Sequence, residues 1–301
     1  LVLLATRLAI GLTGGLVDNL CATYISDLYG DKRSRFISIL HTLYAIGSMA
    51  GPQFAAWSVA RGGWFVCYLV SGSAIAVAAV LYLLVTRLLS PPETAMKAPE
   101  EEEKPQGIPY GRMLRNANMR WLCVSSVLFS GLTYLTIWLP TYLDWLDRET
   151  YTVEFCALLM TLNYVGMILS RMGLAALSQR MSTIFYVKWS SLLTALLLIA
   201  MLWIGTPAVW MVGVFLFGVI SGGNYTAKFV LACEEFPRYA ATATALSGMF
   251  GSLGSILFNA GIGAIADAGH YTAALFIPVA ALLLAFLIFT FFYREPGKGA
   301  R

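Results

Sequence analysis

The chain has 301 residues, of which 58% are hydrophobic and only 12% are charged, and its mean hydropathy is +0.72. Soluble globular proteins carry about a quarter of their residues as charged side chains, so this composition excludes an ordinary soluble domain and indicates a chain that lies in lipid. The net charge of +4 is too small and dispersed to indicate a nucleic-acid partner. The five cysteines are widely spaced and form no CxxC or Cys/His cluster, so we predict free thiols and no metal site.

Nine segments are apolar and long enough to cross a bilayer as helices, which takes about 20 residues each. None of them alternates polar and apolar residues as a strand does. We therefore predict an all-α polytopic membrane protein. The segments cover residues 3–26, 36–60, 64–86, 118–144, 153–177, 183–204, 208–232, 240–265 and 271–293.

A stretch rich in proline and acidic residues, 90–116, divides these segments into a set of three and a set of six. Such a composition is typical of a solvated linker. We predict that residues 1–89 hold the last three helices of one bundle. Residues 117–293 are expected to form a second bundle of six helices, followed by a short tail at 294–301.

The distribution of lysine and arginine predicts the orientation of the chain. If the connection at 26–36 is cytoplasmic, 16 of the 20 Lys and Arg residues fall on that side. Cytoplasmic loops carry an excess of these residues. We therefore predict that residue 1 lies outside, that the C-terminus and the linker are cytoplasmic, and that the protein is integral to a plasma membrane, with a bacterial inner membrane favoured.

The last three segments repeat features of the first three. The pairs Gly14-Gly15 and Gly222-Gly223 are 208 residues apart, and Gly47-Ser48 and Gly251-Ser252 are 204 apart. Three-helix repeats arranged in two bundles are typical of secondary transporters. The pattern predicts two pseudo-symmetric bundles of six helices, so three further helices are expected before residue 1.

Several motifs resemble the major facilitator superfamily. TRLAIGLTGG (6–15) looks like the fourth-helix pattern of that family, and SRMGLAALSQRMS (170–182) resembles its loop between the second and third helices of a half. EEFPRYAATATALSGMFGSLGS (234–255) resembles the junction of the tenth and eleventh helices. The resemblance implies nine helices, four to twelve of an expected twelve, in an N-terminally truncated chain. LHTLYAIGSMAGP (40–52) is similar to the fifth helix of fucose-permease-like sugar:proton symporters.

This resemblance implies a secondary active transporter of a small polar solute, a sugar or another organic metabolite, that works by proton-coupled symport and alternating access. An exporter of drugs or metabolites is the nearest alternative, and a membrane scaffold or receptor is an alternative of another class. An enzyme would need His, Asp or Glu side chains gathered at one membrane surface, and the two histidines lie far apart. We predict no enzymatic activity, no cofactor and no obligate protein partner; lipid, the solute and protons are the expected partners.

Two titratable residues are candidates for proton coupling. Asp18 lies nine residues, or about 13 Å of helix, before Asp27 at the cytoplasmic end of its segment. A charged carboxylate near the bilayer centre costs about 2.5–3.5 kcal/mol, and protonation removes most of this cost. A static polar contact between helices is the alternative. His41 could titrate near neutral pH, or could be a hydrogen-bonded interfacial histidine.

Polar side chains inside the segments are candidates for a substrate cavity. Ser221, Asn224, Tyr225 and Lys228 follow the spacing of one helix face, which we expect to line a water-filled cavity. Lys228 could bind an anionic substrate or anchor the helix at the membrane surface. The amides of Asn163 and Asn259 suit sugar hydroxyls but also helix–helix hydrogen bonds. The rings of Tyr134 and Trp138 could stack on a sugar or pack in the core. The predicted cavity residues are Asn19, Tyr44, Ser48, Tyr134, Trp138, Asn163, Ser221, Asn224, Lys228 and Asn259.

Charged residues at the cytoplasmic ends of the segments are expected to form a gate by charge pairing. Glycines are expected to let helices approach closely, among them Gly248, Gly251 and Gly254. The predicted gate residues are Arg35, Arg180, Glu234, Glu235 and Arg238.

Overall fold

The computed structural model describes residues 4–14, 17, 21, 33–88, 110–177, 181–236 and 239–294. Within these ranges, nothing is described for the side chains of residues 33–42, 45, 88, 133–136, 174–177, 240 and 241. All regular elements in the described part are helices. The chain divides into two compact units, Leu1–Ser48 with Ser58–Pro105 and Met49–Trp57 with Gln106–Arg301.

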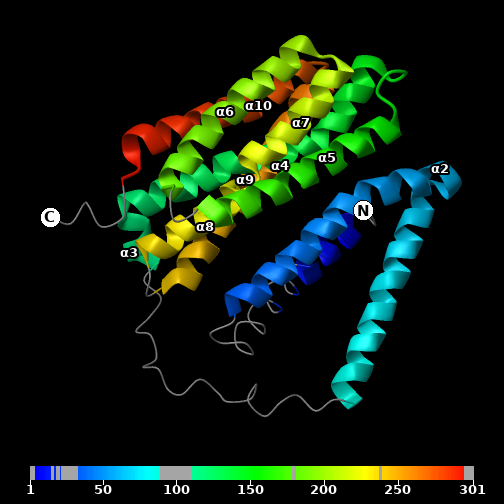
Figure 1. Ribbon diagram of the computed structural model, residues 1–301, viewed down its shortest axis with the longest axis horizontal. Coiled ribbons are helices and arrows are strands. Elements are labelled where there is room, and N and C mark those ends of the chain that lie inside the picture. Colours follow the sequence, from blue (N-terminus) through cyan, green and yellow to red (C-terminus); the bar gives the residue numbers. More distant parts are fainter. Residues whose placement is uncertain are drawn as a thin grey trace. The chain divides into compact units, whose positions relative to one another are not determined.

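The helix α2 (Arg33–Leu88) contains a break at a glycine pair. Gly62 and Gly63 leave the helical region of backbone space, and Gly63 has φ 72°, which favours glycine over any residue with a side chain. Figure 1 shows the chain turning sharply along α2. The two segments predicted at 36–60 and 64–86 therefore form the two arms of α2, and the loop expected between them coincides with the break.

The second unit is a bundle of helices that lie side by side (Figure 1). Its short first helix falls in the last part of the linker predicted at 90–116. The bounds of the other helices follow the six segments predicted between 118 and 293. The elements are α3 (Tyr110–Arg115), α4 (Ala117–Asp147), α5 (Val153–Leu177), α6 (Thr183–Ile204), α7 (Pro207–Ser221), α8 (Asn224–Glu235), α9 (Ala240–Asp267), α10 (Tyr271–Leu287) and η4 (Ile288–Phe292).

Local sequence explains where these helices begin and end. The side chain of Asn116 accepts a hydrogen bond from the Met119 N–H at 2.9 Å and so caps the start of α4. Gly205 ends α6 with a left-handed φ of 66° and donates its N–H to the Met201 carbonyl. Pro207 then occupies the first turn of α7, where its missing N–H costs nothing.

Seven helices in the described part are long and apolar enough to cross a membrane. Six lie in the second unit, and one of these, Pro207–Glu235, runs through both α7 and α8. The seventh, Ile46–Arg87, has 42 residues, about twice the length that one crossing takes, and the break in α2 divides it. The all-α membrane fold is confirmed. The count of nine stays a prediction, because the segment at 3–26 is described only in part.

Small residues bring helix backbones of the second unit into contact. A methyl group on Gly218 of α7 would collide with the carbonyl oxygen of Asn163 on α5. A methyl group on Gly254 of α9 would lie 2.5 Å from the carbonyl oxygen of Val127 on α4. Gly248 has no such neighbour within 4 Å, so close approach does not explain this glycine. The contacts α5–α7 and α4–α9 therefore depend on glycine at specific positions.

The substitution Gly254→Ala tests the contact between α4 and α9. We expect it to lower the free energy of unfolding by about 1–3 kcal/mol, because the added methyl meets backbone atoms that cannot turn away. Thermal unfolding of the purified protein in detergent measures the change. Gly173→Ala on α5 is the matched control: no atom lies within 4 Å of its methyl position, and alanine is a better helix former by about 1 kcal/mol. A Gly254→Ala protein as stable as this control would show that the two backbones do not touch there.

Candidate functional site

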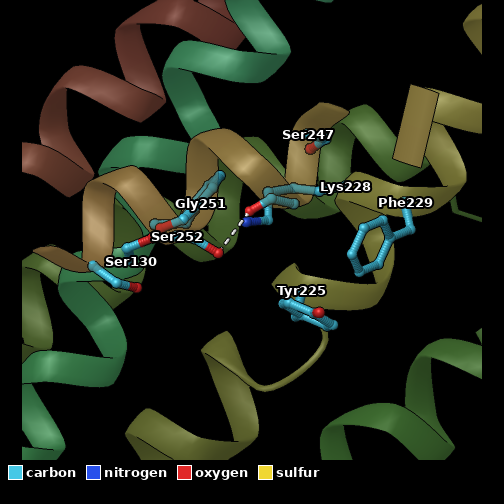
Figure 2. Close-up of a pocket in the computed structure, with 10 residues that line it drawn as sticks. Ser130, Tyr225, Lys228, Phe229, Ser247, Gly251 and Ser252 are labelled. Atoms are coloured by element: carbon cyan, nitrogen blue, oxygen red, sulfur yellow. Dashed lines mark hydrogen bonds between the residues drawn. The ribbon is translucent and has the colours of Figure 1, made fainter. Parts of the chain in front are cut away.

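A cavity of about 170 Å³ lies between α4, α8 and α9 of the second unit. Its lining combines aromatic rings, hydroxyl groups and a single ionised side chain, Lys228. Figure 2 shows this side chain extending from α8 toward α9, with Tyr225 and Phe229 of α8 on another side. The lining residues are Phe129, Ser130, Tyr225, Lys228, Phe229, Ser247, Gly248, Gly251, Ser252 and Ser255.

The ammonium group of Lys228 is buried against aromatic faces. The residue is 7% exposed, and its Nζ lies 5.5 Å from the ring centroid of Phe129 and 5.6 Å from that of Tyr225. Such contacts contribute about 2 kcal/mol when the cation is desolvated, whereas removing an ion from water costs several kcal/mol. Among the residues that the structure describes, no carboxylate pairs with Lys228 and no acceptor takes a hydrogen bond from it. Its charge is therefore only partly compensated.

The serine hydroxyls around Lys228 differ in what they can offer to a ligand. Ser130 Oγ donates to the Gly251 carbonyl at 2.6 Å, and Ser252 Oγ donates to the Gly248 carbonyl at 3.2 Å. A hydroxyl has one proton, so these two serines present only lone pairs to the cavity. Ser255 forms no hydrogen bond with other described residues and keeps its proton for a ligand.

The polar face expected from Ser221, Asn224, Tyr225 and Lys228 is divided between two environments. Tyr225 and Lys228 line the cavity. Ser221 and Asn224 are buried and do not line it: the Ser221 hydroxyl donates to a carbonyl of its own helix, and Asn224 Oδ1 accepts from Ser190 of α6 at 2.8 Å. The structure thus brings two of the four residues together at the cavity.

Side chains from other helices hold the backbone where α7 passes into α8. The N–H of Gly223 donates to Ser170 Oγ and to Tyr186 Oη, each at 3.0 Å. Tyr186 Oη in turn donates to the Ile220 carbonyl at 3.0 Å. Gly222 and Gly223 keep right-handed dihedrals, so the helix path continues through the junction. The sequence analysis identified Gly222-Gly223 only as part of a repeat and did not predict the roles of Ser170 and Tyr186. A glycine pair inside a span could have indicated them, because backbone groups freed there need partners from other helices in lipid.

Comparison with known proteins identifies the family to which this bundle belongs. The model of the Major Facilitator Superfamily matches residues 1–259 and, in a second match, residues 157–301. The chain belongs to the Major Facilitator Superfamily (MFS). The cis,cis-muconate transport protein of Acinetobacter baylyi (strain ATCC 33305 / BD413 / ADP1) is 21% identical over 285 residues, which cover 92% of this chain and 68% of that protein.

These findings confirm the family resemblance and the prediction that the chain is a transporter and not an enzyme. The MFS chain is an integral membrane protein, a secondary transporter of small organic solutes. The resemblance to fucose-permease-like symporters gains no support from them and stays a prediction.

Other predicted cavity residues of the MFS chain do not line the cavity around Lys228. Trp138 Nε1 of α4 donates to Asn259 Oδ1 of α9 at 3.0 Å, so these two side chains join helices. Asn163 is 3% exposed, and its Oδ1 has no partner among the described residues. In the first unit, Tyr44 is exposed and Ser48 is half-buried on α2.

Several predicted residues fall outside the description. Asp18, the first candidate for proton coupling, is one of them, and the side chain of His41 is another. Their roles therefore stay predictions. The residues or side chains outside the description are Asp18, Asn19, Arg35, His41, Tyr134, Arg180 and Arg238.

Glu235, one of the predicted gate residues, is held by amide groups. Asn116 Nδ2 donates to its Oε1 at 2.7 Å, and Asn118 Nδ2 donates to its Oε2 at 3.0 Å. Asn118 also exchanges two hydrogen bonds with the backbone of Arg294, at 2.9 and 3.2 Å. This amide cluster (Asn116, Asn118, Glu235 and the Arg294 backbone) joins the start of α4, the end of α8 and the chain after η4.

Tyr293 lies close to this cluster, and both burial and the nearby carboxylates affect its pKa. Tyr293 follows η4 and is 6% exposed. Burial, with Glu235 and Glu234 nearby, raises the pKa of the Tyr293 hydroxyl well above its usual value. This hydroxyl therefore stays neutral throughout the physiological pH range.

The pair Glu235→Gln and Glu234→Gln tests the amide cluster. We expect Glu235→Gln to lower the free energy of unfolding by about 1.5–3 kcal/mol, because one amide donor then faces another donor in place of a charged acceptor. Glu234 is exposed beside it, so Glu234→Gln should change stability by less than about 0.5 kcal/mol. Thermal unfolding in detergent measures both variants. Equal effects would mean that the amide contacts contribute nothing.

Proposed function

We propose that this MFS protein is a proton-coupled symporter that takes up a small polar organic solute by alternating access. The observation that carries the proposal is the cavity between α4, α8 and α9, which lies within membrane spans and holds a buried ammonium group. Ionisable side chains inside spans are costly and mark solute or ion pathways. The cavity pairs polar groups with aromatic rings, as solute sites do.

The name of the relative guides the choice of solute. It assigns to that protein the transport of cis,cis-muconate, an organic acid. Because this chain is similar to that protein, we propose organic acids as the first solutes to test. Neutral sugars, which the resemblance of residues 40–52 favours, are the comparison.

Alternating access would move two bundles about a central site. We assign residues 1–89 to the first bundle, residues 90–116 to a cytoplasmic linker and residues 117–293 to the second bundle. The excess of Lys and Arg on one side supports a cytoplasmic C-terminus. We place the protein in a bacterial plasma membrane, where an inward proton gradient can drive uptake.

Asp18 is the group that we propose for proton coupling, with His41 as a second candidate. The support for Asp18 is its position in the middle of an apolar segment. A carboxylate that is charged when hydrated and neutral when occluded can carry a proton across together with the solute.

Uptake of labelled cis,cis-muconate by bacterial cells that produce the protein tests this proposal. We expect accumulation that a protonophore abolishes. We expect Asp18→Asn to abolish accumulation while exchange of labelled for unlabelled solute continues, because exchange needs no net proton movement. Asp267→Asn, at the exposed end of α9, is the matched control and should accumulate the solute normally.

Two results would contradict the proposal. Accumulation that persists in the presence of the protonophore would exclude coupling to protons. Normal accumulation by the Asp18→Asn protein would exclude Asp18 as the coupling group. Labelled L-fucose in the same cells distinguishes a sugar carrier from a carrier of acids.

A further inference from the structure

We infer that Lys228 binds the carboxylate group of the transported solute, so that the substrates are small organic acids with a flat, apolar body. This inference rests on the proposed function and names the chemical class that its cavity selects.

The first argument is the charge of the cavity. Lys228 is the single ionised group of the lining, and within the described part of the chain no carboxylate offsets its charge. The rings of Phe129 and Tyr225 attract the ammonium but are poor acceptors for its three N–H donors. A carboxylate that enters the cavity would supply both the opposite charge and the acceptors. A neutral sugar would leave the charge uncompensated.

The second argument is the arrangement of donors. A carboxylate only accepts hydrogen bonds. Ser130 and Ser252 already donate their protons to backbone carbonyls, whereas Ser255 donates to no other described residue. The Lys228 ammonium and the Ser255 hydroxyl, on two different helices, are therefore groups of this cavity that can donate to a carboxylate.

The third argument is the shape and chemistry of the remaining lining. Tyr225 and Phe229 meet edge to face with ring centroids 4.7 Å apart, and Phe129 lies across the ammonium. Aromatic side chains of this kind favour contact with a flat, unsaturated body. The volume of about 170 Å³ is smaller than the roughly 300–1,000 Å³ of typical ligand pockets. The cavity therefore suits a small acid.

Lys188 shows that packing on aromatic rings does not by itself make a site. Its Nζ lies 5.7 Å from the ring centroids of both Trp189 and Phe286. Lys188 is half-buried and does not line the cavity. Its ring contacts are similar to those of Lys228, but it lies outside the hydroxyl-lined cavity, and it is the matched control for the experiment.

Binding of benzoate and benzamide to the purified protein, measured by isothermal titration calorimetry, tests the inference. The two probes have almost the same shape, and only benzoate carries the charge. We expect benzoate to bind at least about 30-fold more tightly than benzamide. We expect Lys228→Met to weaken benzoate binding by about 30-fold or more, Lys228→Arg to restore part of the loss, and Lys188→Met to bind as the unchanged protein does.

Three results would overturn the inference: no binding of benzoate to the unchanged protein, equal binding of benzoate and benzamide, or undiminished binding of benzoate by a folded Lys228→Met protein. If Lys228→Met does not fold, the binding of benzoate and of benzamide to the unchanged protein and to the Ser255→Ala protein still tests the inference. Ser255→Ala should weaken the binding of benzoate and leave that of benzamide unchanged. A protein that accumulates solute with protons but does not bind benzoate overturns this inference alone. A protein that binds benzoate but accumulates nothing overturns the proposed function alone.

Discussion

The structure depends on one constraint, the absence of hydrogen-bond partners in the hydrocarbon core of a membrane. Each polar group inside a span must find its partner within the protein. Many polar groups of the second unit meet this requirement, since serine hydroxyls donate to carbonyls of their own or a neighbouring helix, and Gly223 donates its N–H to Ser170 and Tyr186. Asn163 Oδ1, which has no partner among the described residues, is an exception. Against this background Lys228 is unusual, because its charge is buried and is offset only by ring faces among the described residues.

The same helices that pack closely also leave the cavity open. On α9, Gly254 lies against the backbone of Val127, and Ser247 bonds to Ser126 at 2.7 Å. These contacts hold α4 and α9 together on either side of Gly251, whose position for a methyl group is 3.8 Å from its nearest neighbours. Small residues therefore serve two purposes on one helix: contact between backbones, and space beside Lys228.

The sequence predicted the all-helical membrane fold well because hydrophobic length is a local property of each segment. The six segments between 118 and 293 match the helices closely. The site was harder to predict, because the direction of a side chain depends on the rotation of its helix within the bundle. The periodicity of α8 placed Asn224 and Lys228 on one face, yet Asn224 bonds to Ser190 while Lys228 faces the cavity. Partners far apart in sequence, such as Asn118 and Glu235, leave no local pattern.

The amide cluster at the end of α8 has a mechanical consequence. A pair of opposite charges attracts over many ångströms and weakens with added salt, whereas a hydrogen bond from an amide falls off within a few tenths of an ångström. The bonds from Asn116 and Asn118 to Glu235 therefore form only when the start of α4 is already in place, and they exert little attraction at longer range. Because the same Asn118 amide also bonds to the backbone of Arg294, a shift of the start of α4 breaks contacts with the ends of two spans at once.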